Sequence, residues 1–123
     1  MGRGTERQGW REAVEIVFRD SKMQRTCSSE REAARKWGEN APALLARLAL
    51  LQAADRLRDL VDAPGRFHAL TGDRAGQFSL ALRGPHRLIF EVADEPVPTL
   101  ADGGVDIAEV RTVRILEVAQ YHG

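Results

Sequence analysis

The sequence predicts an α+β fold in which helices pack on one antiparallel sheet. A short β-branched and aromatic segment comes first, leucines at helical spacing follow, and apolar residues alternate with polar ones after Gly65. This order of one strand, two helices and about four further strands is typical of helices gathered on one face of a sheet. A chain of 123 residues normally forms one core, so we expect a single domain at residues 13–123 after a flexible extension at residues 1–12.

The first predicted strand covers residues 14–18, where valine, isoleucine and phenylalanine side chains favour extended structure. Residues 21–37 are mostly polar with scattered apolar positions, a pattern that predicts a helix. The run Cys27-Ser28-Ser29 is a candidate break within it, and Gly38 supplies a stop signal.

The second predicted helix begins with Asn40 as its N-cap and Pro42 in its first turn. Its apolar face is formed by Leu44, Leu45, Leu48 and Leu51. The same spacing continues through Leu57 and Leu60, so we expect this helix to run on until Pro64-Gly65. With the helix before it, it would form an antiparallel helical hairpin.

Beyond Gly65 the apolar period changes from helical to two, which predicts strands. Residues 78–82 and 87–90 are expected to pair as a β-hairpin, because Gly84-Pro85 between them favours a turn. The prolines and glycines of residues 94–106 predict a loop, and residues 110–118 are the last predicted strand.

Composition excludes several classes of protein. The longest apolar stretch, at residues 41–54, is interrupted by Arg47, so we expect no membrane-spanning helix. The first residues lack the apolar segment of a secretory signal, which favours a cytoplasmic location. Cys27 is the only cysteine, which excludes an intrachain disulfide and any metal or redox site built on paired cysteines.

Charge is segregated along a chain whose formal net charge is zero. Four arginines oppose one aspartate between residues 66 and 90, whereas seven carboxylates oppose two arginines from residue 91 onward. Zero net charge argues against a general nucleic-acid binder, because binding to phosphates normally requires a basic surface. Any phosphate site is therefore expected in the positive stretch.

Several motifs along the chain, in a fixed order, resemble one family of small proteins. They are Trp37-Gly38 with the leucine-rich helix after it, LRDL, PGRFHALTGDRAGQFSLAL, HRLIF and the closing RILEVAQYH. In this order they resemble the HigB-like toxins of the RelE superfamily over residues 14–122. The resemblance implies a compact RelE-like fold, similar to that of microbial ribonucleases, with an N-terminal strand and a helical hairpin on an antiparallel sheet.

The resemblance also implies a type II toxin that cleaves mRNA in the ribosomal A site without a metal or cofactor. In such chemistry the 2′-OH of the RNA attacks the adjacent phosphate, so the protein must supply an acid, a base and positive charge. His68, Tyr121 and His122 match the family's acid–base positions. Arg74 and Arg87 match its phosphate-binding positions, and Arg66 is a further phosphate-binding candidate in the same positive stretch.

Two positions depart from the family pattern. Thr71 stands where many members have lysine, and Gln120 stands where they have aspartate. Both changes remove a charge from the neighbourhood of the expected site.

Three functions remain open at this stage. The first is a ribosome-dependent mRNA endonuclease, and the second a non-enzymatic toxin, resembling the ParE branch, that binds a protein target such as DNA gyrase. The third is a catalytically weakened toxin homologue that serves as a subunit of an antitoxin complex. The resemblance implies a HigA-like helix-turn-helix antitoxin as partner, besides the ribosome and mRNA, and contact with operator DNA only through that antitoxin.

Overall fold

A five-stranded sheet forms the centre of the fold, with its strands in the order β1-β5-β4-β3-β2. The structure is a computed structural model and describes residues 13–120, so the predicted extension at residues 1–12 lies outside it. The strands are β1 (Glu15–Phe18), β2 (His68–Ala69), β3 (Gln77–Ala81), β4 (His86–Val92) and β5 (Thr112–Gln120).

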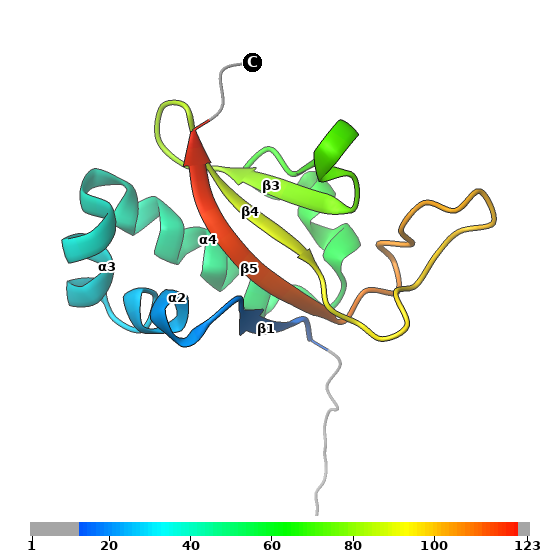
Figure 1. The fold of residues 1–123 in the computed structure, drawn as a ribbon, viewed down its shortest axis with the longest axis horizontal. Helices are drawn as coiled ribbons and strands as arrows, with labels where there is room; N and C mark the ends of the chain where they lie inside the picture. Colours follow the sequence, from blue (N-terminus) through cyan, green and yellow to red (C-terminus); the bar gives the residue numbers. More distant parts are fainter. Residues whose placement is uncertain (1–12, 121–123) are drawn as a thin grey trace, which may run out of the picture.

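The helices lie against one face and one end of this sheet (Figure 1). They are α2 (Ser21–Thr26), α3 (Glu30–Trp37) and α4 (Ala41–Ala53), with short 3-10 helices η1 (Gly38–Asn40), η2 (Leu57–Asp62) and η3 (Gly72–Arg74). The predicted α+β class is confirmed. No helix among residues 13–120 is long and apolar enough to cross a bilayer.

The sheet is mixed rather than wholly antiparallel, which corrects one prediction. Strand β1 pairs in parallel with β5, with Ile16 opposite Val113, while the other three pairings are antiparallel. A parallel pair requires a crossover connection. Here the crossover consists of all the helices and the strands β2 to β4, which lie between β1 and β5 along the chain. The first and last strands of the sequence are therefore neighbours in the sheet.

The predicted break in the first helical segment is confirmed, because two separate caps divide it. Asp20 accepts a hydrogen bond from the Met23 backbone N–H at 2.8 Å and begins α2. Ser29 accepts one from the Glu32 N–H at 3.1 Å and begins α3. Each side chain satisfies an amide that has no partner within its own helix.

The prediction that the second helix runs on to Pro64-Gly65 is wrong, because α4 ends at Ala53. Ala54 adopts an extended backbone with ψ 140°, and its carbonyl accepts the Val14 N–H at 2.8 Å at the start of β1. The leucines that extend the helical spacing, Leu57 and Leu60, are buried from η2 instead. Apolar spacing alone did not distinguish one long helix from two short ones.

Asn40 stands at the N-cap position of α4, as the sequence predicts, but its side chain does not cap the helix. It has helical backbone angles and makes no capping hydrogen bond. Its side-chain oxygen instead accepts the Arg83 N–H at 2.8 Å, which ties the start of α4 to the β3–β4 turn. The usual capping role of asparagine at a helix start is therefore overridden by a tertiary contact.

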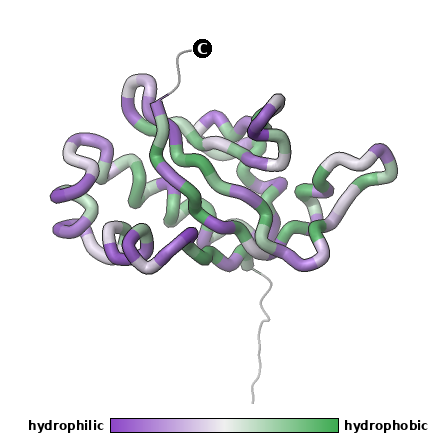
Figure 2. The backbone as a smooth tube through the Cα atoms, in the orientation of Figure 1, coloured by the Kyte–Doolittle hydropathy of each residue, from purple (hydrophilic) through white to green (hydrophobic). Residues whose placement is uncertain are grey.

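The core lies between α4, η2 and one face of the sheet. Leu44, Leu48 and Leu51 of α4 pack in one buried cluster with Phe78, Leu80, Leu88 and Phe90 from β3 and β4. Hydrophobic and hydrophilic residues alternate along the strands, whereas α2 and α3 are largely hydrophilic (Figure 2). Alternate strand residues therefore face away from the helices, and these build the opposite face of the sheet.

The predicted loop at residues 94–106 extends away from the sheet between β4 and β5 (Figure 1). Thr99 and Val105 form an isolated antiparallel bridge within it. At its base, the Asp94 carboxylate accepts the N–H groups of Arg111 and Thr112 at 3.0 and 2.8 Å. This contact sets the start of β5 at Thr112, two residues after the predicted strand start.

The Asp20 cap predicts a pH dependence of stability. The hydrogen bond from Met23 holds the pKa of the Asp20 carboxyl below its ordinary value. Its stabilising effect is therefore complete above the ordinary aspartate range, about pH 4, and is lost as the pH falls through the lowered value. The amide in Asp20→Asn caps α2 without titrating, so urea unfolding should show wild type losing its advantage over this variant only as the pH falls below about 4. A difference that stays constant with pH would contradict this.

Candidate functional site

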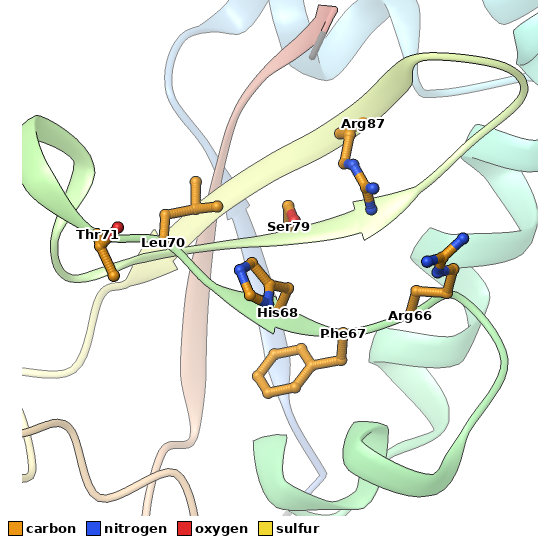
Figure 3. Close-up of a pocket in the computed structure, with 7 residues that line it drawn as sticks. All are labelled: Arg66, Phe67, His68, Leu70, Thr71, Ser79 and Arg87. Carbon is orange, nitrogen blue, oxygen red and sulfur yellow. The ribbon is translucent and has the colours of Figure 1, made fainter. Parts of the chain in front are cut away.

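An open cavity of about 470 Å³ lies where β2, β3 and β4 meet on the face of the sheet turned away from the helices. Seven residues line it: Arg66, Phe67, His68, Leu70, Thr71, Ser79 and Arg87. Figure 3 shows the polar ends of His68, Arg66 and Arg87 gathered around it. Three of the six site residues expected from the sequence are thus brought together here.

His68 lies on the cavity face of the sheet because its neighbour Phe67 packs on the opposite, core-facing side. The Phe67 ring stacks on Phe78 with centroids 5.3 Å apart and lies 6.4 Å from Phe90. Successive side chains of a strand point to opposite faces, so His68 at the start of β2 points away from the aromatic cluster. Its ring is exposed and makes no hydrogen bond or ion pair with any residue between 13 and 120.

Arg66 is positioned by a tight backbone connection before β2. Gly65 has φ 117° and lies so close to α4 that an added Cβ would be 3.1 Å from the Arg47 Nε. Its carbonyl accepts the Ala81 N–H at 2.7 Å, which joins the segment to the end of β3. Arg66 itself has φ 53°, and among residues 13–120 it is the one non-glycine residue with positive φ.

Arg87 projects from the second position of β4, opposite Ala119 of β5 and Ala81 of β3. The small neighbours leave room for its long side chain to extend across β3 toward Arg66 (Figure 3). Its guanidinium has no hydrogen-bond or ion-pair partner among the described residues.

Arg74, a fourth site residue expected from the sequence, lies outside the cavity. Its guanidinium donates to Glu117 Oε2 and to Gln77 Oε1, each at 2.7 Å. Arg114 and Glu91 form a similar pair at 2.7 Å on the same face. The ion-paired arginines therefore tie η3 and the strands together, whereas Arg66 and Arg87 are available to a ligand.

The remaining two candidates, Tyr121 and His122, lie outside the described residues. Their assignment stays a prediction from the resemblance. The last described residue, Gln120, pairs with His86 at the start of β4, one residue before Arg87. Its amide nitrogen lies 3.4 Å from the His86 Nε2.

Positive charge dominates the cavity. Two guanidinium groups and an imidazole surround it, and no carboxylate is among the residues that line it. A guanidinium offers several N–H donors in one plane, which suits phosphate oxygens. Within residues 13–120, histidine, cysteine and carboxylate side chains form no group of three that could hold a metal ion. The arrangement fits an anionic group with a phosphate's geometry.

Ser79 is the polar lining residue that sequence reasoning missed, besides the apolar Phe67 and Leu70. It is 1% exposed and faces the cavity from the middle of β3, directly opposite His68. The signal in the sequence was weak but present, since Ser79 is the polar residue between Phe78 and Leu80 in an alternating strand.

The left-handed backbone of Arg66 predicts a gain in stability when asparagine replaces the arginine. Arginine at positive φ is strained by roughly 1–2 kcal/mol, whereas asparagine adopts this region more readily. Arg66→Asn should therefore raise the free energy of unfolding by about 0.5–1 kcal/mol while weakening anion binding. Urea unfolding and sulfate titration measure the two effects. Arg83→Asn, at an exposed turn position, is the control, and an equal gain there would refute strain as the cause.

Comparison with known proteins gives structural neighbours but no sequence match. No protein-family model matches the chain, and neither does any curated protein. Solved structures similar to the chain include a YoeB/ParE toxin from Agrobacterium tumefaciens, at 18% identity and a TM-score of 0.47 over 89% of this chain and 100% of that one. A YoeB–YefM complex from Staphylococcus aureus matches at 14% identity and 0.47, over 89% and 98%.

Proposed function

We propose that the protein is a toxin of a type II toxin–antitoxin system that cleaves mRNA on the ribosome. One observation carries the proposal: two arginines and a histidine, all without partners among the described residues, surround one open cavity that no carboxylate lines. The motifs that resemble HigB-like toxins supply His68 and Arg87 from the sequence alone, and the positive stretch around them supplies Arg66. The geometry and the resemblance therefore select the same face of the sheet.

In the proposed reaction the scissile phosphate of the RNA lies between Arg66 and Arg87. The 2′-OH of the preceding ribose attacks the phosphorus atom while the bond to the 5′ oxygen of the next nucleotide breaks. Negative charge grows on the phosphate oxygens during this step, and the two guanidinium groups stabilise it. The products are a 2′,3′-cyclic phosphate and a free 5′-OH, so the step consumes no water and no cofactor.

Two proton transfers accompany this reaction. The attacking 2′-OH must lose a proton and the leaving 5′ oxygen must gain one. We assign one of these transfers to the His68 imidazole, which is exposed at the cavity. Tyr121 and His122 remain the candidates for the other, on the strength of the resemblance. With Thr71 at the rim, the two arginines supply the positive charge that a lysine provides in many family members.

A translating cell extract with a defined reporter mRNA tests the proposal. Wild-type protein should produce new ends inside the coding region, with 5′-OH groups on the downstream fragments. An otherwise identical mRNA without a start codon should stay intact, because ribosomes do not translate it. Intact reporter mRNA together with inhibited supercoiling by DNA gyrase would instead support the ParE-like alternative. Intact mRNA and unaffected supercoiling would support the weakened homologue.

The proposal includes an antitoxin partner. We expect a small helix-turn-helix protein encoded beside this gene, and contact with operator DNA only through it. Co-expression of the neighbouring reading frame should yield a complex that no longer cuts the reporter mRNA. Cutting that persists in the purified complex would contradict this pairing.

A further inference from the structure

The hydroxyl of Ser79 is a buried polar group without a partner. The residue is 1% exposed, and its Oγ makes no hydrogen bond with any residue that the structure describes. Buried hydroxyls in folded proteins are nearly always hydrogen-bonded, because losing water without compensation is unfavourable. An alanine would fill the same place in β3 without this cost. The hydroxyl therefore suggests a contact that forms only when the cavity is occupied.

The side chain that faces Ser79 from the neighbouring strand β2 is that of His68. The two residues are direct cross-strand partners in the β2–β3 register. Such partners have Cβ atoms about 4.5–5.5 Å apart, which lets a serine hydroxyl meet an imidazole nitrogen after a change of side-chain rotamer. Figure 3 shows the His68 ring directed from β2 toward the part of β3 that carries Ser79. Neither group has another partner among residues 13–120.

A histidine that moves protons normally has its second ring nitrogen held by another group, often a carboxylate or a backbone carbonyl. No carboxylate lines this cavity. A hydroxyl is both a donor and an acceptor, so it can accept from a protonated ring nitrogen or donate to an unprotonated one. Ser79 therefore has the chemistry needed to hold His68 in both protonation states of a reaction.

We infer that Ser79 is a positioning residue, whose hydroxyl hydrogen-bonds to the His68 ring when a phosphate-bearing RNA occupies the cavity. This inference rests on the proposed function, since it assigns His68 a proton-transfer role. The bond would fix which ring nitrogen faces the RNA. In the empty cavity the exposed ring is free to turn, and the hydroxyl stays unpaired.

The direct test follows the His68 ring by ¹⁵N NMR in the full chain, with a 2′-O-methyl trinucleotide as an uncleavable ligand. In the wild-type complex the phosphate accepts from the outer ring nitrogen, so Ser79 donates to the inner one and the ring should show one dominant tautomer. Ser79→Ala should show a mixture, and Ser79→Thr, which keeps the hydroxyl, should restore one form. Ser28→Ala, which removes an exposed hydroxyl bonded to Arg25, is the control and should behave as wild type. An unchanged tautomer ratio in Ser79→Ala would overturn the inference.

Kinetics in the translating extract give a second readout. Ser79→Ala should lower kcat by about tenfold at unchanged KM, because it disturbs the orientation of a reacting group rather than binding. In a His68→Ala background the same change should have no further effect, since the bond is already absent. Urea unfolding should show that Ser79→Ala is at least as stable as wild type. A serine with a purely structural role would instead lower the stability when replaced, and its replacement would lower kcat by the same factor with or without His68.

The outcomes separate this inference from the proposed function. If wild type cuts mRNA but Ser79→Ala keeps both its rate and a single tautomer, the inference fails and the function stands. If the trinucleotide binds and orders His68 through Ser79 but no mRNA is cut, the function fails and the positioning contact stands.

Discussion

Replacing Arg87 by alanine is expected to lower the rate of mRNA cleavage by about 10²–10³-fold, the effect of removing one donor to a transition-state oxyanion. The guanidinium makes no contact that holds the fold among the described residues, and it reaches over β3 into the cavity. The free energy of unfolding should therefore change by less than about 0.5 kcal/mol. Arg87→Lys should give an intermediate rate, because an ammonium group keeps the charge but loses the planar pair of donors.

Arg83→Ala is the matched control for Arg87. It removes the same charge four residues earlier, from an exposed side chain that pairs loosely with Glu39 at 3.7 Å and does not line the cavity. Its cleavage rate should stay within about twofold of wild type, since exposed charges farther away are screened by salt. Equal losses in the two variants would mean that overall charge, rather than a phosphate held by Arg87, governs cleavage.

Replacing His68 by alanine is expected to lower the cleavage rate by about 10²–10⁴-fold, the range that proton transfer by a positioned side chain supplies. Because the imidazole is exposed, its removal should leave an open space that a free imidazole molecule can enter. Added imidazole should therefore restore part of the activity of His68→Ala, in proportion to its concentration.

His86→Ala is the control for His68. The His86 ring lies 3.3 Å from the Arg83 carbonyl oxygen and 3.4 Å from the Gln120 amide, away from the cavity. Its loss should leave the rate near that of wild type, and imidazole should not raise it. A larger loss from His86→Ala than from His68→Ala would move the proton transfer to the end of the sheet and contradict the assignment.

Most of the fold could be predicted because each element carries a local signal. The alternation around Phe78 and Leu80 predicts a strand, and serines beside Cys27 predict a helix break. The errors arise where distant residues decide the outcome. The Val14 N–H donates to the Ala54 carbonyl, which would otherwise accept a hydrogen bond within a longer α4. The Arg83 N–H donates to the Asn40 side chain, which the sequence predicts as a helix cap. The two partners of each contact are about 40 residues apart in the sequence, so no local pattern contains both.

The candidate site, like the fold, could be predicted where local sequence signals decide and not where contacts between distant residues decide. The positive stretch and the motifs select Arg66, His68 and Arg87, and the structure gathers these three around one cavity. The sequence could not show that Glu117, 43 residues away, pairs with Arg74 at 2.7 Å. Nor could it show that Ser79 faces His68, because that depends on the register between β2 and β3. Residue types were predictable, whereas pairings were not.

The central claim is that RNA binds in the cavity between Arg66, His68 and Arg87. An NMR titration of the full chain with a 2′-O-methyl RNA oligonucleotide tests it most directly. Backbone signals of Phe67, His68, Ser79 and Arg87 should shift together and saturate, and the shifts should weaken in Arg87→Ala but not in Arg83→Ala. Shifts centred instead on the groove between α3 and α4, at Gly38 and Leu45, or no shifts at all, would contradict the account.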